Sequence, residues 1–433
     1  MSEWTLLAMF VGILMFFLFT GYPVAYGIGL TAVVLMIFGV GRSLNAEIFV
    51  SRMFFGLNNF TLLAIPFFLF AGRIMNVGGM TTRIFDFSKA LVGSMKGGLG
   101  HVNVVASMIF AGMSGLATAD AAGLGAIEYK AMKDGGYPEG CCVGLAAASS
   151  TIGAIFPPSV PIVMFAIIAH LSVGQLLIGG IVPGLLIGAV LMAMVFVQSH
   201  LGHLPQGIHF SWPELWKTFK RGILALGTPI ILVSGIMLGI FTPTEAAAVT
   251  VIYALLLAIF IYREVNIKDL WEVIKGTAID STVIIALIGM ASIYGFLIVQ
   301  SQVPQIFASK VLTLTENPYM ILLLVNLLLL TVGMFMETMA ILGILTPILL
   351  PLVREVGVDP IHFGIIMNFN LQIGLMTPPF GMLLFVLNKA TGVPLGKVIR
   401  GVLLYYVPLI ICLILITYFP IFTLWLPNLV FGG

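Results

Sequence analysis

The sequence predicts an all-α polytopic membrane protein built as an inverted repeat, with two re-entrant hairpins and two broken helices. Three observations predict this class: the composition, a series of long apolar runs, and landmarks that recur in both halves. Of the 433 residues, 60% are hydrophobic and only 8% are charged, and the mean hydropathy is +1.15. Because soluble domains carry about 25% charged residues, this chain has too little polar surface to face water on all sides.

The apolar runs approach the length of membrane-spanning helices. Residues 4–19, 181–197, 246–262 and 402–419 contain no charged side chain, and roughly 20 such residues cross about 30 Å of hydrocarbon. Similar runs along the chain predict on the order of ten to twelve spans. The first run starts almost at Met1 and lacks a basic region and a cleavage site, so we predict a retained helix rather than a signal peptide.

Landmarks of the first half recur in the second at a constant distance, which indicates a duplication. The recurring pairs are Gly112-Met113 with Gly333-Met334, Ile152-Gly153 with Ile373-Gly374, and Pro157-Pro158 with Pro378-Pro379. The offsets 333 − 112, 374 − 153 and 378 − 157 all equal 221. If each half holds an odd number of spans, the second half enters the membrane from the opposite side. We therefore divide the chain into a first repeat (1–199), a polar linker (200–222) and a second repeat (223–433).

The polar linker contains an amphipathic segment and three histidines. We expect an interfacial helix from Trp212, with Ser211 as its N-cap. His200, His203 and His209 could hold a transition metal, but their spacing is loose and no Cys or Asp is near, so we predict no such site. The three cysteines, Cys141, Cys142 and Cys412, are expected to be packing residues.

Two segments read as re-entrant hairpins, at about 97–133 and about 320–354. Each holds about a dozen apolar residues before a small, polar tip, and a dozen helical residues cover about 18 Å, little more than half the hydrocarbon thickness. A bent backbone at membrane depth must be satisfied by protein, water or an ion. We therefore expect both tips to lie against polar partners.

Two further segments read as broken helices, at about 138–170 and about 361–389. Paired prolines remove backbone donors and disfavour the helical state before them, and the preceding glycine lets the chain open. A broken helix beside a hairpin tip offers carbonyl and hydroxyl oxygens to a monovalent cation, while half-helix N-termini suit an anion. Two such constellations predict two cation sites with a substrate between them.

Several polar side chains fall on these tips and breaks. The carboxylates Asp120 and Glu337 lie at or just past the tips, where charge is costly and functional by default. The alternative is structural: Asp120 would cap the returning helix and Glu337 would pair with a nearby Lys or Arg. Small hydroxyl residues of the same segments act either as cation ligands or as packing contacts. Arg73 either reaches a substrate carboxylate or snorkels to the interface.

At these motifs the sequence resembles a known transporter family over essentially its whole length. The segments that carry the resemblance are Gly112-Met113-Ser114-Gly115 through Asp120, Ser150 through Pro158, Phe241 through Ala246, and Ile373-Gly374 through Gly381. They look like the large membrane subunit of the tripartite ATP-independent periplasmic (TRAP) transporters. The resemblance implies a sodium-coupled, elevator-type importer of a small organic acid, such as sialic acid or a C4-dicarboxylate, in the bacterial inner membrane.

The resemblance also implies binding residues and partners. Sodium would be bound at Ser114, Asp120, Ser150, Gly153, Glu337, Thr338, Gly374 and Thr377. Substrate would be bound at Gly115, Thr118, Pro157, Arg73 and Pro378. A periplasmic binding protein would deliver the acid, and a small four-helix membrane subunit is expected as a separate chain. Sodium is the coupling ion, no cofactor is expected, lipid surrounds the protein, and a net charge of +2 is too small to suggest nucleic acid.

Two other functions remain open on the sequence alone. A stand-alone sodium–dicarboxylate symporter shares the plan of repeated hairpins and broken helices. An intramembrane enzyme could use Asp120 or Glu337 as an acid or base, although catalysis would not need two equivalent tips. We therefore predict a transporter and not an enzyme.

Overall fold

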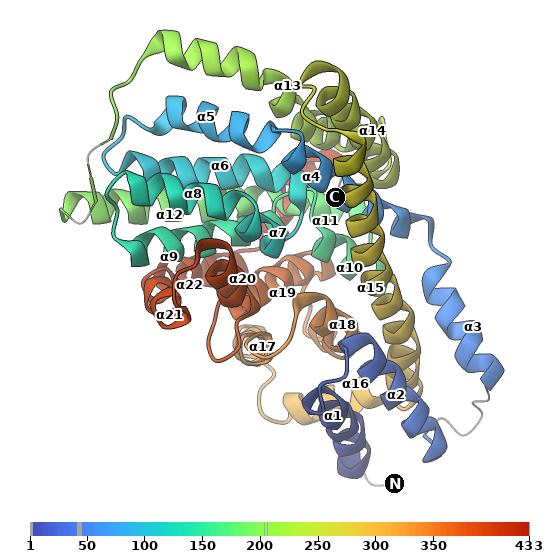
Figure 1. Ribbon diagram of the computed structural model, residues 1–433. Coiled ribbons are helices and arrows are strands. Elements are labelled where there is room, and N and C mark those ends of the chain that lie inside the picture. Colours follow the sequence, from blue (N-terminus) through green and yellow to red (C-terminus); the bar gives the residue numbers. More distant parts are fainter. Residues whose placement is uncertain (1–2, 41–45, 203, 206, 433) are drawn as a thin grey trace.

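The computed structural model describes residues 3–40, 46–202, 204–205 and 207–432. In this part of the chain the only regular elements are helices, as predicted (Figure 1). The first half contains α1 (Glu3–Phe19), α2 (Val24–Ile37), α3 (Ala46–Leu57), η1 (Phe60–Leu63), α4 (Ala64–Val77), α5 (Met80–Val92), α6 (Gly98–Ser114), α7 (Ala117–Ala122), α8 (Leu124–Asp134), α9 (Glu139–Ser150), η2 (Thr151–Ala154), α10 (Val160–Ala169), α11 (Val173–Gly179) and α12 (Ile181–His200). The second half contains α13 (Trp212–Met237), α14 (Pro243–Leu256), η3 (Leu257–Ile261), α15 (Ile267–Gln300), α16 (Val303–Leu312), α17 (Pro318–Gly333), α18 (Thr338–Glu355), α19 (Pro360–Leu375), α20 (Met382–Thr391), α21 (Leu395–Leu403), α22 (Tyr406–Tyr418) and α23 (Ile421–Phe431).

Six helices in the described residues are long and apolar enough to cross a membrane, or up to eight when two bent helix pairs each count as one span. The bent pairs are α20 with α21 and α22 with α23. This number is below the ten to twelve spans expected from hydropathy, because several apolar runs fold as helices of only 10–17 residues. α6, α10 and α17 belong to this shorter class, and they lie in the predicted hairpins and broken helices.

Both segments predicted as hairpins fold as two helical arms joined by a short tip. In the first, α6 ends at Ser114 and the chain returns as α7 and α8; in the second, α17 ends at Gly333 and the chain returns as α18. The predicted bounds differ from the observed helix ends by two residues or fewer. Since α6 and α17 span 17 and 16 residues, each arm is about 25 Å long, too short for a simple span.

Both segments predicted as broken helices are interrupted at their proline pairs. Residues 155–159 separate η2 from α10, and residues 376–381 separate α19 from α20. α7 packs against α20, and α10 packs against α18. The return arm of each hairpin therefore contacts the second half of the other repeat's broken helix, which joins the two repeats at their centres (Figure 1).

The polar linker is not a separate unit. α13 runs without interruption from Trp212 to Met237, so the boundary predicted at residue 222 falls inside a helix. Ser211 occupies the N-cap position, as predicted, but its side chain makes no capping hydrogen bond. The helix continues because no proline lies between its first turn and Pro229, and Gly222 and Gly227 weaken a helix without ending it.

Basic side chains gather at one end of the helices. Arg83, Lys89, Lys220 and Arg221 line one cavity there, and Lys397 and Arg400 line another. Leu204 lines the second cavity and Ile208 the first, so the two cavities lie at the same end. Glu139 and three further acidic residues, Asp86, Glu214 and Glu264, line the same cavities. Because orientation follows the Lys and Arg residues rather than the net charge, we infer that this basic end faces the cytoplasm.

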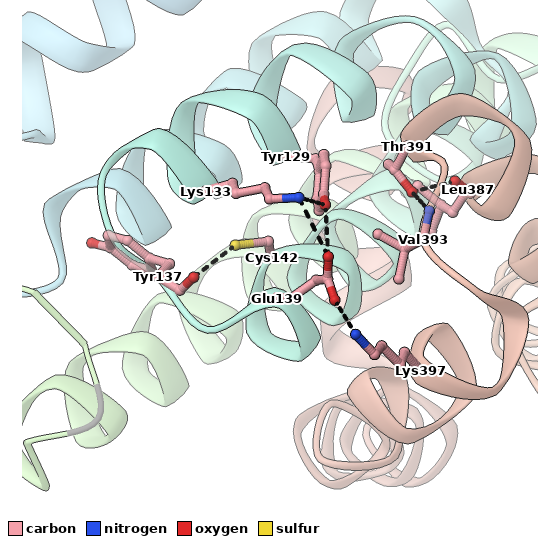
Figure 2. A network of polar contacts seen from close by, with 9 residues as sticks. All are labelled: Tyr129, Lys133, Tyr137, Glu139, Cys142, Leu387, Thr391, Val393 and Lys397. Carbon is pink, nitrogen blue, oxygen red and sulfur yellow. Dashed lines mark hydrogen bonds and ion pairs between the residues drawn. The ribbon is translucent and has the colours of Figure 1, made fainter.

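Glu139, at the start of α9, joins the first hairpin to α21 at this end (Figure 2). Its carboxylate accepts hydrogen bonds from Lys397 (2.9 Å), Lys133 (3.4 Å) and the Tyr129 hydroxyl (3.2 Å). Lys133 and Tyr129 lie on α8 of the first hairpin. The Lys397 ammonium, followed by these two donors, holds the pKa of Glu139 below its usual range.

We expect Glu139→Gln to lower the thermal unfolding temperature at neutral pH. A carboxylate with a depressed folded-state pKa contributes stability that is present above the unfolded value of 4.5 and is lost as the pH falls through the folded value. The variant should therefore lose less stability than the parent on acidification. Thermal unfolding followed from pH 7 to pH 3 tests this, with Glu214→Gln as the control, because that carboxylate forms one exposed ion pair, with Lys217, among the described residues. Parallel pH profiles for parent and Glu139→Gln would contradict it.

Candidate functional site

The first hairpin tip is fixed against the break of its own repeat. Gly115 ends α6 in the left-handed region (φ 66°), which glycine adopts without steric cost. Its carbonyl oxygen accepts a hydrogen bond from the backbone N–H of Val160 (3.1 Å), the first residue of α10. A Cβ at Gly115 would lie 2.6 Å from the Pro158 carbonyl oxygen, so no larger residue fits at this contact.

Asp120 is buried beside the break. It lies in the first turn of α7 and is 1% exposed. A Cβ added at Gly153 would lie only 2.0 Å from the Asp120 Oδ2 atom, so the carboxylate occupies the space that this glycine leaves. The structure therefore brings together two of the residues predicted for the first cation site. Ser150, one turn before Gly153, is also buried, and its hydroxyl donates to the Ala147 carbonyl (2.9 Å).

The second tip repeats this arrangement. The backbone N–H of Gly381, just before α20, donates to the Met334 carbonyl oxygen at the end of α17 (3.2 Å). The donors Val160 and Gly381 are 381 − 160 = 221 residues apart, the offset of the sequence repeat. Gly374 lies directly on Gly333, since a Cβ at Gly374 would be 2.7 Å from the Gly333 Cα atom. Each tip is thus hydrogen-bonded to the start of the following half-helix.

Glu337 is the N-cap of α18. Its Oε2 atom accepts from the backbone N–H groups of Met339 (2.8 Å) and Ala340 (3.3 Å). Among the described residues no Lys or Arg pairs with it, so the ion pair considered from the sequence is not formed. Glu337 thus has the capping role that was considered for Asp120. Both hydrogen bonds that Glu337 accepts in the described chain go to Oε2 and none to Oε1.

The remaining residues predicted for the second site lie on either side of the break. Thr338 is buried, and its hydroxyl accepts from Gln372 Nε2 of α19 (3.4 Å). The Thr377 hydroxyl donates to the Ile373 carbonyl (2.6 Å). The break itself follows, and both the Pro378-Pro379 and Pro157-Pro158 peptide bonds are cis. The side chain of Ser114 lies outside the described residues, and Thr118 is half-buried on α7.

Sequence reasoning missed several buried amides on α19. Asn368 Oδ1 and Gln372 Oε1 are buried and accept no hydrogen bond in the described part of the chain. Asn370 donates to the Asn326 side chain of α17 (2.7 Å), which donates in turn to Thr417 (3.0 Å). The sequence did contain a signal for them, namely amide side chains in an otherwise apolar run. Buried polar groups at membrane depth need partners, so such amides indicate a polar contact or a binding site.

A second buried carboxylate lies between the arms of the first hairpin. Glu128 of α8 is 1% exposed, and it accepts hydrogen bonds from Asn103 Nδ2 (2.6 Å) and Ser107 Oγ (3.1 Å) of α6. The spacing of Asn103 and Ser107 places both on one face of α6. This bridge couples the two arms and was not identified from the sequence.

The Arg73 side chain is paired with an acidic residue of another helix. It forms an ion pair with Asp280 of α15. The pair lines a cavity of about 260 Å³ together with Leu116, Ala119 and Gly123, which belong to the first tip and its return helix. Arg73 is thus directed at the first tip from α4, across the boundary between the hairpin and the neighbouring helices.

Comparison with known proteins agrees with this architecture. The sequence matches the family "Tripartite ATP-independent periplasmic transporter, DctM component" over residues 11–422. It is 43% identical to the sialic acid TRAP transporter large permease protein SiaM of Vibrio cholerae, covering 96% of this chain and 97% of that protein. It is 40% identical to the C4-dicarboxylate TRAP transporter large permease protein DctM of Pseudomonas aeruginosa, covering 89% and 90% of the two chains.

A further relative and a solved structure extend the comparison. The chain is 37% identical to the 2,3-diketo-L-gulonate TRAP transporter large permease protein YiaN of Escherichia coli, over 95% of this chain and 96% of that one. The crystal structure of the Alcanivorax borkumensis YdaH transporter has the same fold, with a TM-score of 0.61, 15% identity and coverage of 89% and 91%. The three relatives named here, each matched over nine tenths or more of its length, carry the names of permeases and not of enzymes. The chain belongs to the DctM family of tripartite ATP-independent periplasmic transporters, as a multi-pass large permease of the inner membrane.

Proposed function

We propose that the chain imports a small organic acid with sodium as the coupling ion, by an elevator movement of the hairpins and broken helices. The observation that carries the proposal is the pair of tip-and-break sites, each closed by a backbone hydrogen bond whose donor lies at the same repeat position. Each site gathers side-chain oxygen atoms: the buried Asp120 carboxylate at the first, and the half-buried Glu337 carboxylate with the buried α19 amides at the second. Oxygen ligands suit hard cations.

The substrate class rests on the relatives. Three of them are named for sialic acid, a C4-dicarboxylate and 2,3-diketo-L-gulonate, and all three are carboxylic acids. The Arg73–Asp280 pair and the cavity beside the first tip support Arg73 as a contact for the acid's carboxylate, because a guanidinium binds a carboxylate through two parallel hydrogen bonds. Gly115, Thr118, Pro157 and Pro378 would line the space between the two tips.

The elevator movement is supported by two groups of helices: α15 with the helices packed around it, and the hairpins with the broken helices. α15, with 34 residues, is about 51 Å long and packs against α2, α3 and α4 on one side and against α18 of the second hairpin on the other. The hairpins and broken helices pack on one another through α7 with α20 and α10 with α18. The cavity between Arg73 and the first tip lies where α4 and α15 meet the first hairpin. In an elevator movement the hairpins and broken helices would slide along α4 and α15 at this boundary.

The proposed partners are a small four-helix membrane subunit, as a separate chain, and a periplasmic binding protein that delivers the acid. The permease protein SiaT of Haemophilus influenzae supports the first, because this chain covers 95% of its own length but only 67% of that protein. The additional length of SiaT is available for a second membrane component.

Uptake driven by ion gradients tests the proposal. Proteoliposomes containing the chain, its small membrane subunit and its binding protein should accumulate labelled acid under an inward sodium gradient, with more than one sodium per acid because there are two sites. A proton gradient without sodium should drive none. Accumulation that follows the proton gradient and is indifferent to sodium would contradict the proposal. Full activity without the small subunit would instead favour a stand-alone symporter.

A further inference from the structure

A cavity of about 510 Å³ lies away from the tips, between α3 and α15 on one side and α10 and α18 on the other. Arg52 of α3, Arg354 at the end of α18 and His170 at the end of α10 all line it. Its volume is within the range of about 300–1,000 Å³ that is typical of small-molecule sites. No residue predicted for the sodium or substrate sites lines it.

The cavity lies on the side opposite the basic end. α15 begins at Ile267, three residues after Glu264, which pairs with Arg83 in the basic end. The first α15 residue that lines the cavity is Ile288, and 288 − 267 = 21 residues correspond to about 32 Å of helix. Because the basic end faces the cytoplasm, the cavity faces the periplasmic side, from which an imported acid arrives.

Positive charge in the cavity is not neutralised by the described residues. None of the residues that line it is acidic. The Arg52 guanidinium lies over the Phe296 ring, 4.0 Å from its centroid, a contact that orients the group and leaves its N–H edges available. Neither the Arg52 nor the Arg354 side chain forms a hydrogen bond or an ion pair within the described chain. Asn59 adds a donor. Its Oδ1 atom accepts a hydrogen bond from the backbone N–H of Thr61 (3.0 Å), and its side-chain N–H₂ donates no hydrogen bond within the described residues.

The walls strengthen the attraction for an anion. Phe55, Ile168, Phe296 and Leu350 line the same cavity as the two arginines, and charge interactions are stronger beside low-dielectric walls than in open water. Two arginines present planar, bidentate donors, which match carboxylate geometry better than an ammonium does. The cavity therefore has the size, the positive charge and the type of donor that a small carboxylic acid requires.

We propose that this cavity is a second anion site, in which Arg52 and Arg354 hold the carboxylate of the acid on the periplasmic side before it reaches the hairpin tips. The identity of the acid rests on the proposed function. The binding of the acid by Arg52 and Arg354 does not depend on the sites at the hairpin tips. The site contains no sodium ligand set, so its binding does not depend on sodium, unlike binding at the tips.

Equilibrium binding of labelled succinate and N-acetylneuraminate to the purified full chain tests this. In nanodiscs of neutral lipid and choline buffer without sodium, the parent should bind at least one of the two acids saturably. Arg354→Gln and Arg52→Gln should each weaken this component at least tenfold, and Arg354→Lys should weaken it less. Arg263→Gln, which removes a charge from the loop before α15 at the basic end, is the matched control and should bind like the parent.

The outcomes separate this inference from the proposed function. A sodium-dependent component that is lost in Asp120→Asn reports on the tips, so its absence from the parent would count against the proposed function and not against this site. No sodium-independent binding of either acid, or binding unchanged in both arginine variants, would overturn the anion site. If the parent instead retains phosphatidylglycerol that Arg52→Gln and Arg354→Gln lose, while acid binding is unchanged, the cavity holds a lipid phosphate and the carboxylate assignment is wrong.

Discussion

Asn in place of Asp120 should reduce acid uptake at limiting sodium by roughly 100-fold, without reducing the yield of folded protein. The substitution preserves the shape of a side chain that is 1% exposed and removes its charge. Removing one partner of a buried charge pair costs about 3–5 kcal/mol, and each 1.4 kcal/mol corresponds to about tenfold in affinity. The measurement is the initial uptake rate in proteoliposomes, normalised to inserted protein.

The control for this prediction is Asp269→Asn. That carboxylate caps α15 at the exposed basic end through the backbone N–H of Asn266 (3.1 Å), far from either tip. Its loss should leave uptake nearly unchanged. A purely structural role for Asp120 would give the reverse pattern, with a lower folded yield and a normal uptake rate for each molecule that inserts.

Alanine at Gly153 and alanine at Gly374 should both abolish uptake, for different reasons. At Gly153 the new Cβ would lie 2.0 Å from the Asp120 carboxylate, a side chain that can move, so the protein should fold with a displaced carboxylate. At Gly374 the new Cβ would lie 2.7 Å from the Gly333 Cα atom, so two backbones must separate. Overpacking of this kind costs about 1–3 kcal/mol, and we expect the folded yield of Gly374→Ala to fall as well.

Gly396→Ala is the matched control, because no atom lies within 4 Å of a Cβ added there. Thermal unfolding and uptake measured on the three variants separate the two effects. Gly153→Ala should unfold near the parent temperature and not transport, Gly374→Ala should fail in both assays, and Gly396→Ala should pass both. Uptake at the parent rate in Gly153→Ala would show that Asp120 and Gly153 do not form a functional contact.

The repeat explains why the hairpins and broken helices could be predicted from the sequence. Two copies of one plan, offset by 221 residues, placed glycine and proline pairs where helices of 16–17 residues end. Glycine and proline act through the local backbone, so their effect can be read from neighbouring residues alone. The end of the linker was misplaced because α13 continues through Gly222, where tertiary packing outweighs a weak local preference.

The partners of individual polar side chains could not be predicted in the same way. Asp280 is 207 residues from Arg73, and Asn326 is 44 residues from Asn370, so these pairs depend on how distant helices pack. Capping by Glu337 needs only two residues of the following helix. From the sequence, capping was considered as an alternative role for Asp120 and not for Glu337. Both carboxylates follow a tip, and the point at which the return helix begins differs between the repeats. The amides of α19 lie in the segment that was predicted as a broken helix. The sequence alone does not show that these amides are buried, and so it did not single them out as site residues.

The central claim is that the two tips hold the coupling cations, and the sodium dependence of uptake tests it most directly. Initial uptake rate is measured against sodium concentration for the parent, Asp120→Asn and Glu337→Gln, with the acid held constant and the rates normalised to inserted protein. If each carboxylate helps to bind sodium, both variants should need more sodium for half-maximal rate, and the shift should precede any loss of maximal rate. Glu337→Gln retains an oxygen that can cap α18, so its fold should persist. Sodium curves that coincide with the parent curve in both variants would contradict the claim.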